Sequence, residues 1–266
     1  MKKTILITGA TDGIGLLAAK KLAEQGHQLL IHGRNQAKLA QISEQLGGAL
    51  TYEADFSDMG AVVQMARAVL AAHERVDVLI NNAGILKTKQ TRTAAGRDVR
   101  FDVNTLAPYI LMRSLLAVIP ETGRVLNLSS AAQAPIDIAA MRAFVPMDDM
   151  AAYAQSKLAI TLWSAEAARE HPNGPAFIAI NPGSLLATKM VKEGFGIDGK
   201  DLNIGADILV RAAIEEEFAS ASGMYFDNDS GGFASAHHAA SDKGYCEEFM
   251  AALAELTQAH INEVCQ

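Results

Sequence analysis

The chain has 266 residues, about the length of one large α/β domain. Hydrophobic residues make up 50% of it and charged residues 20%, which excludes a disordered chain and is typical of a soluble globular protein. The 23 Lys and Arg residues against 30 Asp and Glu residues give a net charge of −7. This acidic balance argues against nucleic acid or an anionic membrane as the main partner.

The sequence lacks the features of a metal-stabilised, disulfide-bonded or membrane-spanning protein. Its two cysteines, Cys246 and Cys265, form no CxxC pair, so neither a zinc site nor a disulfide framework is expected. The N-terminal residues lack the length and the small-residue cleavage site of a signal peptide. No stretch approaches about 18 uncharged apolar residues. We therefore expect a cytoplasmic protein with no metal site and no membrane span.

Short apolar runs alternate along the chain with segments whose apolar residues recur at spacings of three and four. The runs are apolar on both faces, as in strands that are buried in a parallel sheet. The alternation indicates βαβ units with right-handed crossovers. The expected strands are residues 4–8, 28–32, 49–54, 76–81, 124–128, 176–180 and 224–227. The expected helices include residues 14–25, 37–46, 61–72, 106–119, 154–169 and 245–262.

These elements predict an α/β fold, a doubly wound and mostly parallel sheet of about seven strands with helices on both faces. The absence of a linker or repeat predicts a single domain over residues 1–266. The less regular stretches 131–152 and 185–203 follow strands, so they are expected at the carboxyl edge of the sheet, where such folds bind ligands. Residues 234–266 are expected to form a loop and a last amphipathic helix.

A glycine-rich loop follows the first expected strand and leads directly into a helix. Its glycines allow a tight turn and a close approach of the main chain to a pyrophosphate. Free N–H groups at the start of the helix and the helix dipole favour the anion. A plain strand-to-helix turn is the alternative, but the strand–loop–helix context favours a dinucleotide site. The expected cofactor contacts in this loop are Gly9, Thr11, Asp12, Gly13, Ile14 and Gly15.

The residues after the second strand indicate which cofactor is bound. Gly33 lies 24 positions after Gly9, near the interval at which an acidic residue normally holds the adenosine ribose, but no acid stands there. Arg34 and Asn35 follow instead. A guanidinium binds a 2′-phosphate, which a carboxylate repels. We therefore expect NADP(H) to be preferred over NAD(H), rather than Arg34 being only a solvated surface residue.

The end of the third strand is expected to contribute to the adenine site. Asp55, directly after this strand, is suited to accept a hydrogen bond from the adenine amino group, and its neighbour Phe56 is assigned to the same site. The alternative for Asp55 is capping of the helix that begins near Asp58.

Six sequence elements occur in the order that one enzyme family shows. Residues 8–15 resemble a TGxxxGxG loop, residues 81–84 an NNAG element, and residues 153–157 a YxxSK signature. Asn104 in a helix, a serine pair ending at Ser130, and Pro182-Gly183 after the sixth strand complete the series. The chain thus resembles the short-chain dehydrogenase/reductase family, in its single-domain branch. The resemblance covers residues 8–183 and implies a Rossmann-type NAD(P)-binding domain.

The resemblance also implies roles for individual residues. The catalytic residues that it implies are Asn104, Ser130, Tyr153 and Lys157. The further cofactor contacts that it implies are Asn82, Ala83, Gly84, Tyr153, Lys157, Pro182, Gly183 and Thr188, of which Thr188 comes one position later than in the commonest family pattern. The spacing of 23 positions between Ser130 and Tyr153 is similar to that of retinol-dehydrogenase-like and protochlorophyllide-reductase-like members, which suggests a bulky apolar substrate.

The catalytic chemistry can also be argued from the residues themselves. Tyr153 and Lys157 are four positions apart on an expected helix and share one face. The pKa of a free tyrosine is about 10. A neighbouring ammonium, together with the charge of the oxidised nicotinamide, is expected to lower it. Ser130 at a strand end can hydrogen-bond the substrate oxygen, whereas Ser129 points to the opposite face. Asn104 is expected to hold a helix backbone and a water that relays protons to Lys157.

We therefore predict an oxidoreductase that transfers hydride between NADP(H) and a carbonyl or alcohol carbon of a small, apolar substrate. A non-catalytic NADP(H)-binding sensor or scaffold is the alternative, which the presence of both Tyr153 and Lys157 disfavours. Helices within 97–119 and 153–170 are rich in Ala and Leu, and relatives pair through equivalent faces, so a homodimer or homotetramer is expected. Asp148-Asp149 is expected to cap a helix, and His237-His238 to face solvent.

Overall fold

The computed structural model describes residues 1–264 and 266, so Cys265 lies outside the described residues. Within these residues, eight strands form one sheet in the order β3-β2-β1-β4-β5-β6-β7-β8. All neighbours are parallel except β7 and β8, which pair antiparallel. The predicted fold class is therefore confirmed. The strands are β1 (Thr4–Ile7), β2 (Gln28–Gly33), β3 (Leu50–Glu53), β4 (Val78–Asn81), β5 (Arg124–Leu128), β6 (Ala176–Asn181), β7 (Tyr225–Asp227) and β8 (Gly232–Ala234).

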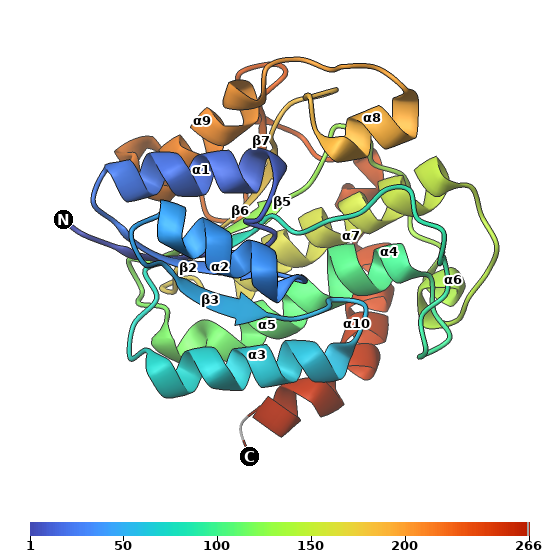
Figure 1. Ribbon diagram of the computed structural model, residues 1–266. Coiled ribbons are helices and arrows are strands. Elements are labelled where there is room, and N and C mark those ends of the chain that lie inside the picture. Colours follow the sequence, from blue (N-terminus) through green and yellow to red (C-terminus); the bar gives the residue numbers. More distant parts are fainter. Residues whose placement is uncertain (265) are drawn as a thin grey trace.

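Helices cover both faces of the sheet (Figure 1). The helices α1, α2 and α9 lie on one face and α3, α5 and α7 on the other, where α10 packs against α3 and α5. The α-helices are α1 (Gly13–Glu24), α2 (Gln36–Gln45), α3 (Met59–Ala72), α4 (Val99–Phe101), α5 (Ala107–Leu115), α6 (Ile138–Arg142), α7 (Asp149–Glu170), α8 (Lys189–Phe195), α9 (Leu202–Ile214) and α10 (Lys243–Val264). Shorter turns are the π-helix η1 (Asp102–Leu106) and the 3-10 helices η2 (Leu116–Val118), η3 (Glu216–Phe218) and η4 (His238–Ser241).

The core consists of two apolar layers, one on each face of the sheet. Successive residues of β1 enter different layers: Ile5 and Ile7 pack with α1, α2 and α9, while Leu6 packs with α3, α5 and α7. All three side chains are fully buried. Burial of such a side chain stabilises the fold by about 2 kcal/mol. The double burial explains why the strands are apolar on both faces.

The structure adds elements that the sequence patterns did not predict. The edge strand β8 follows the last expected strand and was not predicted, because its three partly exposed residues show no apolar alternation. The helix expected over residues 106–119 is instead π-helix, α5 and a 3-10 turn in succession. The stretches expected to be irregular, 131–152 and 185–203, contain the short helices α6 and α8.

The long helix α7 begins five residues before the expected start. The Asp148 carboxylate accepts a hydrogen bond from the main-chain N–H of Ala151 at 2.9 Å, which caps the helix as the sequence predicted. Its partner in the predicted pair, Asp149, forms the first turn of the helix. None of the described helices carries an apolar stretch long enough to cross a bilayer.

Candidate active site

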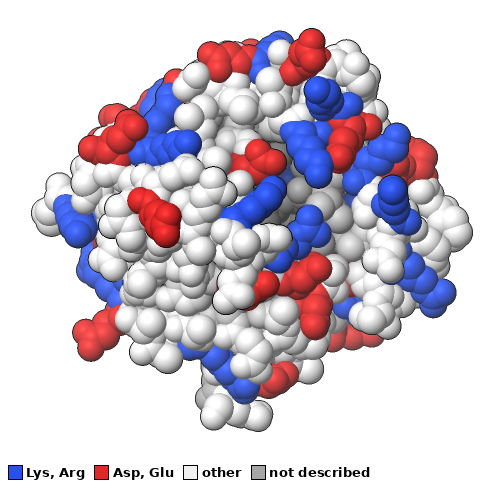
Figure 2. Space-filling model, viewed as in Figure 1, with Lys and Arg blue, Asp and Glu red and all other residues white. Residues whose placement is uncertain are grey.

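A cavity of about 670 Å³ opens at the carboxyl edge of the sheet, beside β1 and β4. Doubly wound folds bind ligands in this crevice because the helices that follow neighbouring strands leave toward opposite faces. Figure 2 shows this face of the molecule hollowed near its centre, with Lys and Arg side chains at the rim. The predicted site residues that line the cavity are Gly9, Thr11, Asp12, Gly13, Ile14, Gly15, Arg34, Asp55, Phe56, Asn82, Ala83, Gly84, Ser130, Tyr153, Lys157, Pro182, Gly183 and Thr188.

Two predicted residues, Asn35 and Asn104, do not line this cavity. A larger cavity of about 920 Å³ lies against α7, β7 and the start of α10, and it contains none of the predicted site residues. The smaller cavity is therefore the candidate active site, because it brings together motifs that are as far apart in the sequence as Gly9 and Thr188.

The three glycines of the first loop serve different purposes. Gly9 and Gly13 have φ angles of 65° and 58°, which favour glycine over other residues. A Cβ atom on Gly9 would lie 2.9 Å from the Cα atom of Ala83, and one on Gly15 would lie 2.3 Å from the Asn82 side chain. At Gly13 the nearest atom is 3.7 Å away. Gly9 and Gly15 thus allow the loop to pack against the residues after β4, while Gly13 leaves open space toward the cavity.

Asn82 fastens the glycine loop to the end of β4. Its side-chain amide donates to the carbonyl oxygens of Thr8 and Gly9 at 2.8 and 3.0 Å. In return, the Thr8 hydroxyl accepts from the main-chain N–H groups of Asn82 and Ala83, both at 3.0 Å. The Asn82 amide therefore shapes the loop, and a direct contact with a cofactor remains a prediction.

His32 is a site residue that the sequence motifs did not indicate, although it directly precedes the Gly33 that was used to position the ribose. Its Nδ1 atom accepts from the Gly9 N–H at 3.2 Å, so Nε2 carries the proton and donates to the Ala54 carbonyl at 3.0 Å. The ring stacks on Phe56 at 4.1 Å between centroids. Burial lowers the pKa of His32 to about 4. The neutral imidazole thus joins the glycine loop to the end of β3.

The residues expected at the ribose and adenine differ in their surroundings. Arg34 lines the cavity, is exposed, and forms no hydrogen bond or ion pair with another described residue. Asn35 caps α2 by accepting from the Lys38 N–H at 2.9 Å. Asp55 accepts from the main chain and the hydroxyl of Ser57 at 2.9 and 2.8 Å. The α3 helix is capped by Asp58, so the alternative capping role expected for Asp55 is wrong.

Three of the four catalytic residues implied by the family resemblance meet in the cavity. Tyr153, Lys157 and Ser130 all line it, and Nζ of Lys157 lies 5.5 Å from the centroid of the Tyr153 ring. The Lys157 ammonium donates to the carbonyl of Leu128 at 2.6 Å. The Ser130 hydroxyl accepts from the Ala132 N–H at 3.1 Å. Strand β5 and helix α7 therefore place a phenol, an ammonium and a hydroxyl around one volume.

Burial determines the protonation of the two titrating groups. It raises the pKa of Tyr153 above the usual value, and the facing Ser130 hydroxyl opposes the rise. It lowers the pKa of Lys157 to about 8. The expectation that the lysine lowers the pKa of the tyrosine is therefore not met by the chain alone. The reason is that burial desolvates the phenolate, while the ammonium is directed to a carbonyl oxygen and gives the phenol no hydrogen bond.

The serine pair at the end of β5 divides as the pleat predicts. Ser129 lines the cavity but is buried, and its hydroxyl contacts that of Thr161 at 2.6 Å and donates to the Lys157 carbonyl at 3.0 Å. Ser130 is less buried, and its main-chain carbonyl accepts from the Tyr225 hydroxyl at 3.1 Å. The first serine supports α7 and the second faces the ligand volume.

Asn104 lies in the π-helix η1 and is fully buried. Its amide nitrogen donates to the Ile85 carbonyl and to the Ser156 hydroxyl, both at 2.9 Å, and its amide oxygen accepts from the Ile85 N–H at 2.8 Å. Asn104 therefore fixes the segment after β4 against α7. The expected role of Asn104 in holding a water that relays protons to Lys157 remains a prediction.

The stretch 185–203 contributes much of the lining that remains, together with Met150 from the stretch 131–152 and residues after β4. Thr188 caps α8 by accepting from the Val191 N–H at 3.2 Å, and its contact with the nicotinamide remains a prediction. Leu185 has a φ of 56°, the one positive value of a non-glycine residue in the described chain. Asp229 accepts from the Ser184 N–H at 2.9 Å and thereby holds this loop to the segment after β7. The apolar lining comprises Ile85, Leu86, Val103, Met150, Leu185, Leu186, Met190, Val191 and Phe195.

Comparison with known proteins assigns the chain to a family. A family model described as short chain dehydrogenase matches residues 3–195. The chain therefore belongs to the short-chain dehydrogenase family, whose members are oxidoreductases with a nicotinamide cofactor.

The similar curated proteins include human retinol dehydrogenase 13, with 29% identity over 85% of this chain and 76% of that protein. Human polyprenol dehydrogenase also shows 29% identity, over 85% of this chain and 77% of that protein. Among solved structures, a short-chain dehydrogenase of Burkholderia cenocepacia in complex with NADP has 27% identity and a TM-score of 0.66, over 85% of this chain and 95% of that chain. An uncharacterised Mycobacterium paratuberculosis protein has a TM-score of 0.79 and 26% identity, over 96% of this chain and 93% of that chain.

Proposed function

We propose that the protein transfers hydride between NADP(H) and a carbonyl or alcohol carbon of an apolar substrate. One observation carries this proposal: Tyr153, Lys157 and Ser130 line the same cavity as the glycine loop that leads into α1. A loop suited to a pyrophosphate and a group suited to proton transfer thereby line one volume.

The shape and chemistry of the cavity fit a nicotinamide dinucleotide. Gly13 presents open space at the N-terminus of α1, where N–H groups and the helix dipole favour an anion. Arg34 has an unengaged guanidinium at the expected position of the adenosine ribose, which supports a 2′-phosphate and hence NADP(H). Phe56, stacked on His32, provides an apolar wall. When bound, the dinucleotide supplies the hydride donor or acceptor.

Tyr153 is the proposed general acid in reduction and general base in oxidation. Burial keeps the phenol protonated, which suits donation of its proton to a carbonyl oxygen. Ser130 donates a hydrogen bond to the same oxygen as negative charge develops on it. Lys157 stabilises the phenolate that remains, because its ammonium lies over the ring of Tyr153.

The lining of the substrate side supports a bulky apolar substrate. Leu86, Met150 and Phe195 are among the apolar side chains around this end of the cavity. The similar proteins named for retinol and polyprenol act on molecules of that kind, which agrees with the lining. We propose long or cyclic apolar alcohols, or the corresponding carbonyl compounds, as the substrate class.

The first experiment measures oxidation of NADPH and of NADH by the purified protein with a panel of apolar aldehydes and ketones. Substitution Tyr153→Phe is expected to lower kcat by about a hundredfold or more while NADPH fluorescence still reports binding. Binding of NADPH without turnover of any substrate, and no effect of Tyr153→Phe, would instead support the sensor or scaffold alternative.

A second experiment tests the cofactor preference. Substitution Arg34→Ala is expected to weaken NADPH binding by about tenfold or more and to leave NADH binding nearly unchanged, because only NADPH carries the 2′-phosphate. Tighter binding of NADH than of NADPH by the unaltered protein would overturn the assignment of Arg34.

We also propose a cytoplasmic homodimer or homotetramer, to be tested by light scattering. The outer faces of α5 and α7 were expected to pair, and α10 packs against α5 from the same chain. Any pairing face must therefore include α10 or avoid α5. A monodisperse monomer at micromolar concentration would contradict the proposal.

A further inference from the structure

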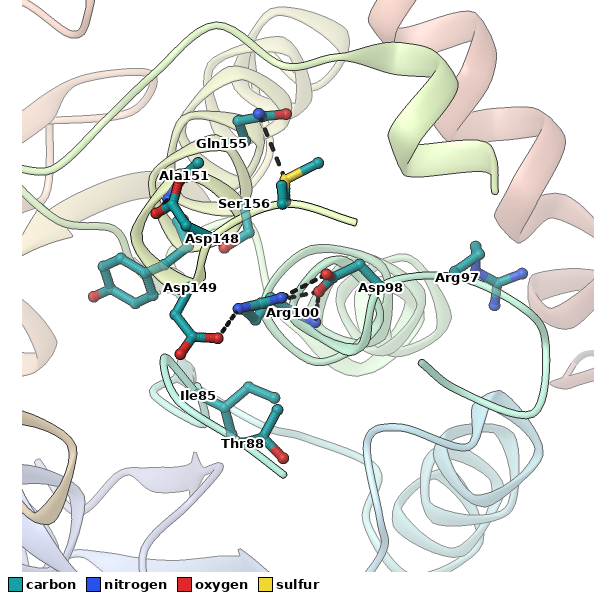
Figure 3. Close-up of polar contacts among 12 residues, drawn as sticks. Ile85, Thr88, Arg97, Asp98, Arg100, Asp148, Asp149, Ala151, Gln155 and Ser156 are labelled. Carbon is teal, nitrogen blue, oxygen red and sulfur yellow. Dashed lines mark hydrogen bonds and ion pairs between the residues drawn. The ribbon is translucent and has the colours of Figure 1, made fainter. Parts of the chain in front are cut away.

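A buried arginine lies beside the catalytic helix. Arg100, in α4, is fully buried, and its side chain bonds the equally buried Asp98 at 2.8 and 2.6 Å. Its remaining terminal nitrogen, Nη1, donates to the Asp149 carboxylate at 2.5 Å. Figure 3 shows Arg100 between the two carboxylates, whereas Arg97 lies apart and has a separate partner, Asp102.

These bonds connect the two segments that carry catalytic residues. Asp149 lies in the first turn of α7, four positions before Tyr153 and therefore on the same face of the helix. Arg100 lies four positions before Asn104, at the junction between α4 and the π-helix. The ion pair thus joins the beginning of α7 to the segment that contains Asn104.

A second link joins the same two segments about two turns further along α7. Asn104 donates to the Ser156 hydroxyl at 2.9 Å, and Thr105 donates to the Ser156 carbonyl at 3.1 Å. Tyr153 lies between this link and Asp149 along the helix. The part of α7 that follows Tyr153 is attached to the end of β5 by two bonds. The Lys157 ammonium donates to the Leu128 carbonyl, and the Ser129 hydroxyl donates to the Lys157 carbonyl. Among the hydrogen bonds and ion pairs of the described residues, the bond between Arg100 and Asp149 links the side chains of the first turn of α7 to α4.

We propose that Arg100 and Asp149 are positioning residues for Tyr153, a role that rests on the proposed hydride-transfer function. The pair holds the first turn of α7 against α4, so that the phenol keeps its distance from the Ser130 hydroxyl. A displacement of about 1 Å at a reacting group can lower a rate by about a hundredfold. The pair acts through the placement of Tyr153 and makes no contact with the reacting atoms.

Asp149 is the better residue to alter, because it is accessible and its loss leaves Arg100 paired. Its side chain is 37% exposed, and Arg100 keeps both bonds to Asp98 when Asp149 is replaced. The matched control is Glu170, which lies in the last turn of α7, is also 37% exposed, and pairs with Arg113 at 2.6 Å. Both substitutions remove one partly exposed carboxylate from the same helix.

We expect Asp149→Ala to lower kcat at least tenfold while KM for NADPH and the melting temperature stay close to those of the unaltered protein. Asp149→Asn keeps an acceptor oxygen for Arg100 without the charge, so it should restore most of kcat. Glu170→Ala should leave kcat within twofold. A kcat of Asp149→Ala within twofold of the unaltered protein would overturn the proposal. An equal loss of kcat in Glu170→Ala would also overturn it, in favour of a general effect of helix stability. An equal loss in Asp149→Asn would overturn it in favour of an effect of the Asp149 charge alone.

Hydrogen–deuterium exchange separates this proposal from the function on which it rests. Faster exchange at the main-chain amides of residues 151–156 is expected in Asp149→Ala, and exchange in Glu170→Ala should match the unaltered protein there. If the unaltered protein turns over no substrate, the proposed function fails, and the exchange result alone decides whether the pair anchors the helix. Unchanged exchange in Asp149→Ala would remove the anchor.

Discussion

The ammonium of Lys157 lies 5.5 Å from the centre of the Tyr153 ring, and it donates its hydrogen bond to the Leu128 carbonyl. The lysine therefore approaches the phenol from one helical turn away without giving it a hydrogen bond. Both groups are desolvated, which raises the pKa of the phenol and lowers the pKa of the ammonium, so that the neutral form of each is favoured. The protonation of Tyr153 and Lys157 should therefore change when a charged group enters the cavity. The titration of the two groups without such a charge can be measured.

The first prediction concerns stability at alkaline pH. The pKa of Lys157 is about 8 in the folded protein, below its value of about 10.4 in the unfolded chain. Between these values the unfolded chain binds more protons, so the contribution of Lys157 to the free energy of unfolding rises with pH, by about 2 kcal/mol from pH 8 to 10. Lys157→Met should flatten this rise in urea titrations. An identical slope in both proteins would contradict the lowered pKa.

The second prediction concerns acid. The pKa of His32 is about 4 when folded against about 6.5 when unfolded, so the unfolded chain binds more protons as the pH falls through this range. The free energy of unfolding should therefore fall by about 3 kcal/mol between pH 6.5 and 4 through this group. NADPH binding should weaken only as the pH approaches 4, because folded His32 takes up its proton there and protonation of Nδ1 breaks its bond to Gly9. His32→Gln should remove the contribution of His32 to the slope of the unfolding free energy against pH. From pH 7 to 8, where His32 is largely neutral in the folded and the unfolded chain, the stability curves of the two proteins should be parallel.

The third prediction uses the serine pair as its own control. Ser130→Ala should lower kcat by about a hundredfold, because the donor to the developing oxyanion is lost. Ser129→Ala should lower the free energy of unfolding by about 1 kcal/mol and change kcat only severalfold, because its hydroxyl bonds Thr161 and the Lys157 carbonyl. Steady-state kinetics and chemical denaturation measure both. Equal kinetic losses would show that the two serines share one role.

The fourth prediction concerns the glycine loop. A Cβ atom at Gly15 would lie 2.3 Å from the Asn82 amide nitrogen, so Gly15→Ala must displace the side chain that holds the loop. A loss of about 1–3 kcal/mol in stability is expected, together with weaker NADPH binding. Gly26→Ala is the control: its φ is 84° and no atom lies within 4 Å, so it should cost about 1 kcal/mol of strain and leave binding unchanged. Unaltered NADPH binding by Gly15→Ala would contradict the prediction and show that the packing of the loop does not determine cofactor affinity.

The sequence was sufficient to predict those features whose residues all lie in one short segment. The buried strands, the cap at Asp148 and the glycine loop each depend on neighbouring residues and were predicted within a few positions. The π-helix around Asn104 was not predicted, because its shape depends on bonds to Ile85 and Ser156, which are distant in the sequence. His32 was missed because its partners, the Gly9 N–H and the Ala54 carbonyl, are main-chain groups without a sequence signature.

The sequence by itself determined the alternation of buried strands and helices, the family and the identity of the proposed proton donor, because periodicity and motif spacing are properties of the chain alone. Only the tertiary structure decided the protonation of Tyr153 and Lys157, since desolvation depends on how β5 and α7 close around them. It alone also joined Arg100 to Asp149, 49 positions apart. The partners of a buried charge depend on how distant segments of the chain pack together, and no local pattern contains that information.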